Sequence, residues 1–322
     1  MEYTQFGKSG LKVSKLCLGT MNFGPYTEEK DSYKIMDKAI DEGINYFDTA
    51  NVYGLDKGKG LTEEIIGRWL KKSGNRDKIV LATKVYGKMG DFPNQGNLSA
   101  YHIKRACEGS LKRLQTDHID LYQMHHIDRD TPWEEIFQAM EQLITEGKIT
   151  YVGSSNFAAW NIAEANTLAK QRNFLGLISE QSIYNLRNRH IELEVIPAVR
   201  NFRMALVPWS PLGGGILCGV LDKKHKGRRN REPLKKSAER LRPQLEKYEK
   251  LCKDIGHEPA DVALAWVLQN KDITSPIIGP RTIKQLEQNI EVLNIKLDED
   301  TLNKLDEIWP GPGNQAPEAY AW

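Results

Sequence analysis

Four polar side chains, a carboxylate, a phenol, an ammonium and an imidazole, occur where apolar, strand-like segments of the chain end. Asp48 and Lys84 each close one such segment, His125 directly follows another, and Tyr53 lies in the loop after Asp48. If the three segments are neighbouring strands, their ends bring the four side chains to one point. A phenol placed beside an ammonium and an imidazole can hold and deliver a reactive proton. These four residues are therefore the first candidates for a catalytic site.

The chemistry of the four groups is complementary. Free tyrosine has a pKa of about 10, which is high for proton donation and recovery near neutral pH. A nearby ammonium favours the phenolate, so we expect Lys84 to lower the pKa of Tyr53. Asp48 can hold the ammonium in place, and His125 can donate a hydrogen bond to a substrate oxygen that gains negative charge. Taken singly, Asp48 could instead cap a helix, Lys84 could form a surface ion pair, and His125 could be a hydrogen-bonded, half-buried side chain.

Strand-like and helical segments alternate along the chain. The strand-like segments are Leu16–Gly19, Ile44–Asp48, Ile79–Lys84, Ile119–Met124, Thr150–Ser154, Leu177–Gln181, Ala205–Pro208 and Ser275–Gly279. The helical segments are Ser32–Glu42, Glu63–Lys72, Ala100–Leu114, Trp133–Glu146, Ala158–Gln171, Ile191–Asn201, Pro259–Asn270 and Thr282–Val292. Eight strands alternating with helices predict an α/β fold, a closed (β/α)8 TIM barrel formed as one domain by residues 1–322. An open, doubly wound sheet is the alternative, but no G-x-G-x-x-G follows the first strand.

Other segments lie outside this repeat. Residues Tyr3–Ser14 predict an N-terminal hairpin that caps the bottom of the barrel, and a helix is expected near Glu239–Ile255. Pro310–Gly313 should end the preceding helix at Trp309 and begin a C-terminal tail. The aromatic residues at the end of this tail could close the substrate pocket, or could pack on the outer helices.

The composition of the chain limits the partners, sites and cellular location that we expect. Apolar residues make up 40% of the chain, charged residues 27%, and the net charge is +2, so neither nucleic acid nor an anionic membrane is expected as a partner. Cys17, Cys107, Cys218 and Cys252 are far apart and form no C-x-x-C, so we expect no metal site and no disulfide framework. The first residues lack a secretory signal, and scattered thiols are typical of a reducing cytosol. The expected location is cytoplasmic.

Several motifs along the chain together resemble those of the aldo-keto reductase superfamily. They are Asp48-Thr49-Ala50-x-x-Tyr53-Gly54, Thr83-Lys84, Asp120-Leu121-Tyr122-x-x-His125, Gly19-Thr20-Met21, Gly153-Ser154-Ser155-Asn156-Phe157, Trp209-Ser210-Pro211-Leu212-Gly213 and Gly279-Pro280-Arg281-Thr282. The resemblance implies a barrel that holds an extended NADPH/NADP without a Rossmann domain and reversibly reduces a small-molecule aldehyde or ketone. It also implies that Tyr53 is the general acid, that Asp48 and Lys84 tune it, and that His125 orients the carbonyl.

The same resemblance implies a set of cofactor contacts. The set is Gly19, Thr20, Met21, Asp48, Ser155, Asn156, Gln181, Trp209, Ser210, Pro211, Leu212, Gly214, Gly279, Arg281, Gln285, Gln288 and Asn289. Within it, Ser155, Asn156 and Gln181 would bond the nicotinamide carboxamide, and Trp209 would stack on the nicotinamide ring. Arg281 stands beside a predicted helix start, where a guanidinium and a helix N-terminus both favour phosphate. A solvated loop cation is the other explanation for Arg281.

Two further features leave alternatives open. The basic run Lys223–Arg231 could close over the cofactor's phosphates, could be a solvated loop, or, least of all, could bind nucleic acid. Met124, Tyr86, Phe157 and Trp160 lie near strand ends and are candidates for the substrate pocket, although Trp160 could equally serve helix packing.

Two other functions are compatible with the motifs. One is a redox-sensing binding protein similar to potassium-channel β subunits, for which tight NADPH binding with negligible turnover is the discriminating result. The other is a barrel lyase or isomerase that uses Lys84 as a Schiff base, which borohydride trapping would reveal.

Overall fold

The strands form a closed barrel. The computed structural model describes residues 1–221 and 232–321, so the basic run Lys223–Arg231 lies outside the described part. Eight parallel strands of the described chain pair in the order β10-β3-β4-β5-β6-β7-β8-β9. They are β3 (Cys17–Gly19), β4 (Tyr46–Asp48), β5 (Val80–Val85), β6 (Ile119–Met124), β7 (Ile149–Ser155), β8 (Leu177–Gln181), β9 (Ala205–Leu206) and β10 (Ile277–Ile278). Leu206 pairs with Ile273, and the Ile277 N–H donates to Pro208 O at 2.8 Å, which joins the two ends. The predicted (β/α)8 barrel is confirmed.

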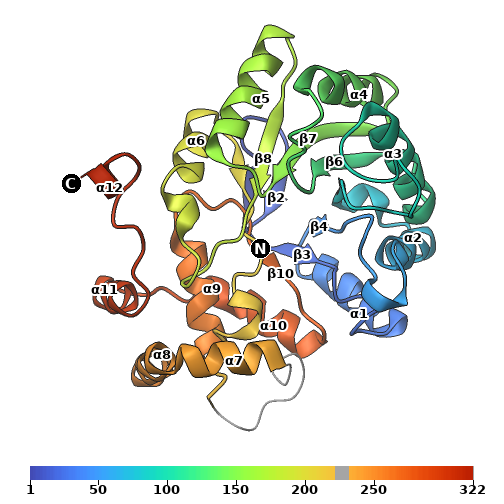
Figure 1. Cartoon of the computed structure of the whole chain (residues 1–322). Coiled ribbons are helices and arrows are strands. Elements are labelled where there is room, and N and C mark those ends of the chain that lie inside the picture. The colour runs from blue at the N-terminus through green and yellow to red at the C-terminus, as the bar shows by residue number, and fades with distance from the viewer. Residues whose placement is uncertain (222–231, 322) are drawn as a thin grey trace.

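Helices surround the strands on the outside of the barrel (Figure 1). They are α1 (Glu29–Asp41), α2 (Leu61–Ser73), α3 (Ala100–Leu114), α4 (Trp133–Thr145), α5 (Ala159–Gln171), α6 (Val195–Asn201), α7 (Glu232–Arg240), α8 (Arg242–Asp254), α9 (Pro259–Gln269), α10 (Ile283–Glu291), α11 (Glu299–Ile308) and α12 (Glu318–Ala321). Each large helix buries an apolar stripe, most of them against the outer face of the strands, whereas α8 packs against α9 and α11. Of the helices described, none combines the length and the apolarity needed to cross a bilayer.

Two helix predictions are wrong at their starts, and proline explains both. The segment Ile191–Asn201 opens with a 3-10 turn, and α6 begins at Val195, so that Pro197 falls in its first turn. The helix expected at Glu239–Ile255 is divided between α7 and α8, and Pro243 lies in the first turn of α8. Proline lacks an N–H and clashes with the carbonyl four residues earlier, so it is tolerated only where a helix starts.

At other helix ends, capping residues adjacent in the sequence behave as predicted. The Ser99 hydroxyl accepts a hydrogen bond from the His102 N–H at 3.2 Å and caps α3. Gly43 and Gly147 follow α1 and α4 with φ of 82° and 69°, a left-handed conformation that glycine adopts without strain. Local residues therefore account for where these helices begin or end.

The N-terminal hairpin closes the bottom of the barrel, as predicted. Its strands β1 (Tyr3–Gln5) and β2 (Lys12–Ser14) pair antiparallel. Between them, Phe6 enters the barrel interior and meets Tyr46 edge-on, with ring centroids 5.4 Å apart. A Cβ at Gly7 would lie 2.6 Å from the Ala205 backbone nitrogen, so only glycine lets the hairpin approach the strands this closely.

Alternation along the strands places apolar and polar side chains at different depths inside the barrel. In β5, Ala82 lies in the inner apolar core and Lys84 follows it on the same face two residues later. In β6, Leu121 and Gln123 repeat this arrangement. The interior is therefore apolar at the bottom and polar at the C-terminal ends of the strands.

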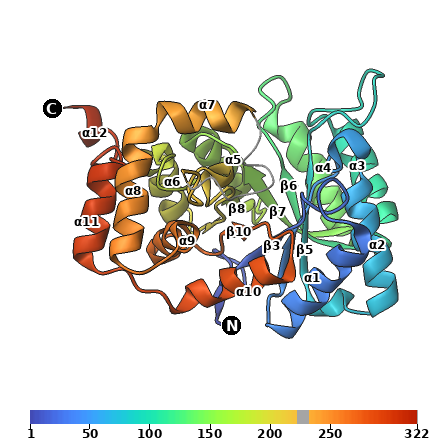
Figure 2. The same cartoon turned by 90° about the horizontal axis from the view of Figure 1, so that it is seen from below.

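The C-terminal tail leaves the barrel on its outer side. Helix α11 ends at Ile308, and Trp309 follows it before Pro310, as predicted. Farther on, the Ala316 N–H donates to Leu193 O at 2.9 Å, which places the tail beside the chain that enters α6. Figures 1 and 2 both show α12 at the edge of the molecule near α11. The described tail residues do not line the central cavity. The side chains of Tyr320 and Trp322, on which closure of the pocket or packing on the outer helices depends, lie outside the described part.

Candidate active site

The structure brings Asp48, Tyr53, Lys84 and His125 together at the C-terminal ends of β4, β5 and β6, three neighbouring strands. Lys84 Nζ lies 2.5 Å from Asp48 Oδ1 and 3.4 Å from the Tyr53 hydroxyl. The rings of Tyr53 and His125 meet edge-on with centroids 6.0 Å apart. The convergence expected from the strand ends is therefore observed.

Lys84 is fully buried and uses all three of its N–H groups. It donates to Asp48, to the Thr49 carbonyl oxygen at 2.8 Å and to Tyr53. Burial lowers the pKa of Lys84, but the carboxylate of Asp48 and the Tyr53 hydroxyl more than offset it, so the net pKa is raised. The side chain is a fixed positive charge beside the phenol, and a surface ion pair is excluded as its explanation.

Asp48 is held by three donors from three different strands. Oδ1 accepts from Lys84, while Oδ2 accepts from Gln181 Nε2 at 2.8 Å and from Gln123 Nε2 at 3.0 Å. Gln123 was not among the residues expected at the site. A signal was present, because Gln123 lies two residues before His125 and so faces the same side of an apolar strand.

The expected decrease in the pKa of Tyr53 is wrong in direction. Desolvation raises the pKa of the phenol, and the positive charge of Lys84 offsets only part of this effect, so the net pKa lies above its ordinary value. Lys84 does lower the pKa of Tyr53, as expected, but by less than burial raises it. Tyr53 is therefore protonated at neutral pH, and the ammonium of Lys84 lies where it would stabilise a phenolate.

His125 is a neutral imidazole in this site. Burial, the Lys84 ammonium and the adjacent His126 lower the pKa of His125 to about 3. The rings of His125 and His126 stack with centroids 5.1 Å apart and planes 8° apart. A neutral imidazole can donate one N–H to a substrate oxygen but is not a proton source at neutral pH. Of the two groups that face the cavity, Tyr53 is thus the better acid.

We expect the ring resonances of His125 to remain unchanged from pH 8 to about pH 4. Protonation would place a charge in a desolvated position beside Lys84, so it is postponed to a pH near 3. The measurement is an NMR pH titration, with the His125→Gln variant identifying the signal. The denatured chain is the control, since its histidines titrate near pH 6.5. A midpoint between pH 6 and 7 in the folded protein would contradict the neutral assignment.

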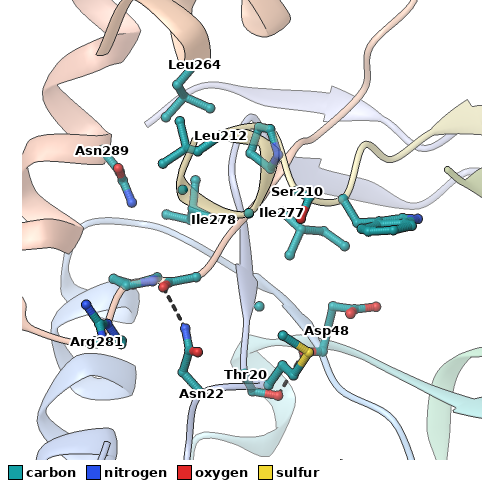
Figure 3. Close-up of a pocket in the computed structure, with 18 of the residues that line it drawn as sticks. Thr20, Asn22, Asp48, Ser210, Leu212, Leu264, Ile277, Ile278, Arg281 and Asn289 are labelled. Carbon is teal, nitrogen blue, oxygen red and sulfur yellow. Dashed lines mark hydrogen bonds between the residues drawn. The ribbon is translucent and has the colours of Figure 1, made fainter. Parts of the chain in front are cut away.

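One cavity connects the tetrad to the end of β10. Its volume of about 470 Å³ falls in the range of ligand pockets. Every residue expected to contact a cofactor lines it, as do Tyr53 and His125, whereas Lys84 lies behind the wall. Figure 3 shows Thr20 and Asp48 on one side of this cavity and Arg281 and Asn289 on another. Gly215, which lies in the segment Ser210–Leu217 expected to line the cofactor's pyrophosphate, borders the cavity too. Lining residues that were not expected are Asn22, His126, Cys218, Ala260, Leu264, Ile277, Ile278 and Pro280.

Near the tetrad, the amide side chains are already engaged with the protein. Asn156 Nδ2 donates to the His125 carbonyl oxygen and to Ser155 Oγ, and its Oδ1 accepts from the Trp209 indole at 3.0 Å. Gln181 Nε2 donates within the Asp48 cluster, which leaves its oxygen to accept from a ligand. Asn156 therefore positions the Trp209 ring, whose half-exposed surface borders the cavity.

At the far end of the cavity, the start of α10 faces the same space. The Thr282 hydroxyl accepts from the Gln285 N–H at 3.2 Å, and the Gln285 side chain accepts from the Arg281 N–H at 2.8 Å. No ion pair occupies the Arg281 guanidinium within the part of the chain described. A free guanidinium beside a helix N-terminus is suited to a phosphate group.

Between the two ends, a short glycine-rich segment forms the cavity wall. Gly213, Gly214 and Gly215 have φ of 59°, 69° and 105°, and a Cβ at Gly214 or Gly215 would meet nothing within 4 Å. Such a backbone can approach a ligand closely, although the N–H groups of Gly213 and Gly215 already donate to Ser210 O and Leu212 O. An aromatic face, a glycine segment and a free guanidinium in one cavity are donors and surfaces that could hold a dinucleotide.

The four residues considered for the substrate pocket lie in different parts of the structure. Met124 and Phe157 are buried in the core between the strands and the helices, so they do not reach the cavity. Tyr86 meets His126 edge-on, with ring centroids 5.4 Å apart, and His126 lines the cavity. Trp160 is exposed beside a different groove, so neither explanation offered for it applies.

The chain matches the model of the Aldo/keto reductase family over residues 15–310. It is 54% identical to an uncharacterized oxidoreductase, YrpG, of Bacillus subtilis (strain 168) over the full length of both chains. It is 32% identical to versiconal hemiacetal acetate reductase of Aspergillus parasiticus, covering 95% of this chain and 96% of that one. A probable voltage-gated potassium channel subunit beta of Arabidopsis thaliana is 33% identical, covering 99% of this chain and 100% of its own. With the barrel and the geometry of its four converging residues, these similarities show that the chain belongs to the aldo/keto reductase family.

Proposed function

We propose that the protein reduces an aldehyde or ketone to an alcohol, with NADPH as the hydride donor and Tyr53 as the general acid. The observation that carries the proposal is the buried Asp48–Lys84 pair placed against the Tyr53 hydroxyl at the end of a ligand-sized cavity. An ion pair taken out of water at such a place is costly as structure alone, and it is typical of a tuned catalytic group. The direct test is a panel of carbonyl compounds followed by NADPH absorbance.

The reaction requires a hydride at the carbonyl carbon and a proton at the carbonyl oxygen, and the side chains of the site suit both requirements. When bound, NADPH supplies the hydride that reaches the carbonyl carbon. The neutral His125 can donate an N–H to the carbonyl oxygen, and Tyr53 can donate its O–H to the same atom. As the oxygen becomes an alkoxide it is far more basic than a phenolate, so Tyr53 protonates it even with a raised pKa. Lys84 then stabilises the phenolate until solvent restores the proton.

NADPH rather than NADH is proposed because of the group at the far end of the cavity. The two cofactors differ by the 2′-phosphate on the adenosine ribose. Arg281 lines that end of the cavity at the start of α10, and its guanidinium can bond a phosphate through two N–H groups. The described residues that line the cavity there contribute no carboxylate to hold a bare ribose hydroxyl.

We expect Arg281→Ala to weaken NADPH binding about ten- to a hundredfold while leaving NADH binding nearly unchanged. A charge-assisted pair of hydrogen bonds contributes roughly 1.5–3 kcal/mol, and each 1.4 kcal/mol is about tenfold in affinity. Both dissociation constants can be measured by fluorescence titration. Lys284→Ala is the matched control, because this cation lies on the first turn of α10 without lining the cavity. Equal losses for both cofactors would show that Arg281 supports the loop and does not select the phosphate.

A second function has one observation in its favour, the similarity to a probable potassium channel subunit beta. Under that alternative, the protein binds NADPH tightly and reports its redox state with negligible turnover. Single-turnover oxidation of bound NADPH by a carbonyl separates the two functions, since a reductase completes the step within one catalytic cycle and a sensor does not. The complete tetrad favours the reductase.

A further inference from the structure

Glu180, in β8, is a fully buried carboxylate that the proposed reaction does not use. It pairs across the sheet with Ser154 of β7 and with Leu206 of β9. Leu206 belongs to the apolar core between the strands and the helices, and its paired neighbour Glu180 points to the same outer side of the barrel. Glu180 does not line the central cavity. Any part that it plays in the reaction must therefore pass through other residues.

The described part of the chain provides no ion-pair partner for Glu180. The groups that bond its carboxylate are hydroxyls and backbone N–H groups. Burial raises the pKa of Glu180 from 4.5 to about 6, against the effect of these hydrogen bonds. The folded state therefore loses stability as the pH rises from 4.5 to about 6, and the loss persists at neutral pH. A buried charge that lowers stability is typical of a residue that serves a function.

Three donors from two neighbouring strand ends hold this carboxylate. Ser154 Oγ, near the end of β7, lies 2.5 Å from Oε2. Oε1 accepts from the Phe157 N–H at 3.1 Å and from Ser182 Oγ at 2.6 Å. Because Phe157 lies in the loop after β7 and Ser182 in the loop after β8, the carboxylate joins the two loops. An ionised carboxylate accepts up to about four hydrogen bonds and donates none, which suits three converging donors.

The two loops that Glu180 joins are those that support Trp209. The Trp209 backbone N–H donates to Ser182 O at 3.0 Å, and its indole N–H donates to Asn156 Oδ1 at 3.0 Å. Asn156 has a φ of 60°, a left-handed conformation that strains residues other than glycine. The N–H of Phe157, the next residue, is bonded to Glu180 and fixes the chain at this point. Both supports of the Trp209 ring therefore meet at one carboxylate.

We propose that Glu180 is a positioning residue that fixes the plane of the Trp209 ring and, through it, the nicotinamide half of the cofactor. This role rests on the proposed function, in which NADPH lies in the cavity with its nicotinamide against Trp209. The adenosine end would lie at the start of α10, where Arg281 and Gln285 bond each other. Loss of the Glu180 carboxylate should therefore weaken the contact with nicotinamide and spare the contact with the adenosine phosphate.

Glu180→Gln keeps the size of the side chain but replaces one acceptor oxygen by an NH2 group, which cannot accept from a hydroxyl or an N–H. The two probes are NADPH and 2′,5′-ADP, which carries the adenosine 2′-phosphate and lacks nicotinamide. Calorimetry should show NADPH affinity lowered about fivefold or more, as for one lost charged hydrogen bond, and 2′,5′-ADP affinity within about twofold of the parent. If the parent does not bind NADPH, the proposed function fails together with this role. If the parent binds NADPH and Glu180→Gln binds it equally well, the role of Glu180 alone is refuted.

Glu63→Gln is the matched control. Glu63 is an equally buried carboxylate, but it lies on α2, accepts from Thr83 and Arg113, and joins neither of the two loops. This substitution should leave the ratio of the NADPH and 2′,5′-ADP affinities unchanged. A change of that ratio as large as the one in Glu180→Gln would overturn the proposal. Equal weakening of both ligands in Glu180→Gln would overturn it too, since it would show general damage to the fold.

Ser182→Ala keeps the test decisive if Glu180→Gln does not fold. It removes one donor to the carboxylate and leaves the backbone bond to Trp209 in place. NADPH affinity should fall about twofold to fivefold, with 2′,5′-ADP binding unchanged. The double variant should bind NADPH no more weakly than Glu180→Gln, because both substitutions act on one contact. Unchanged NADPH affinity in Ser182→Ala would refute the proposal.

Discussion

Tyr53→Phe is expected to reduce kcat for carbonyl reduction by roughly a hundredfold to ten-thousandfold, the range that a single general acid contributes. The substitution removes one hydroxyl, which accepts from Lys84 at 3.4 Å and is the atom placed to protonate the substrate oxygen. His125 cannot take over this role, because its pKa of about 3 leaves it neutral and a poor proton source at neutral pH. NADPH affinity should stay within about twofold, since none of the proposed cofactor contacts is removed.

Steady-state kinetics and a fluorescence titration of NADPH measure the two quantities separately. Tyr101→Phe is the control, since Tyr101 is exposed on α3 and its hydroxyl accepts a hydrogen bond from the neighbouring Arg105 side chain. It should behave as the parent protein. If Tyr53→Phe retained a tenth of the parent kcat, Tyr53 would lose its assignment as the acid. If NADPH binding were lost instead, the hydroxyl would have to be reassigned to cofactor binding.

Lys84→Met is expected to be the second severe substitution, and it should act on both turnover and stability. Lys84 is completely buried, and its removal leaves the carboxylate of Asp48 without its cation. Breaking a buried ion pair by deleting one partner costs about 3–5 kcal/mol of unfolding free energy. The phenolate of Tyr53 also loses its stabilising charge, so the pKa of Tyr53 should rise further and kcat should fall by at least about a hundredfold.

A double substitution separates these two effects. In Lys84→Met/Asp48→Asn the uncompensated carboxylate is gone, so chemical denaturation should show that much of the lost stability returns. Turnover should not return, because the charge beside Tyr53 is still missing. The pH–rate profile of any residual activity should have its basic limb at higher pH than in the parent protein. A single variant with the parent profile and rate would disprove the role of Lys84, whatever its stability.

The positions of the strands and of the tetrad could be predicted from the sequence because the signals are local. Apolar runs closed by Asp48, by Lys84 and just before His125 mark the ends of strands, and β6 and β8 begin and end where the sequence predicts. Parallel neighbouring strands must present their ends at the same side of a barrel, so convergence of the side chains follows from the topology alone. Helix starts were predicted less well. Pro197 and Pro243 are tolerated in the first turn of a helix and not in its interior, so each marks a later helix start than the apolar pattern alone indicates.

The electrostatic state of the site was decided by the tertiary structure. The direction of the pKa shift of Tyr53 depends on whether desolvation or the positive charge of Lys84 has the larger effect. Neither effect can be calculated from the spacing of residues along the chain. In the same way, Gln123 and Gln181 meet at Asp48 only because the barrel brings β6 and β8 to one interior. Sequence patterns determine which side chains are available at each strand end. Burial, hydrogen-bond partners and the surroundings of a residue such as Trp160 arise only when distant segments pack, because they depend on distances through space.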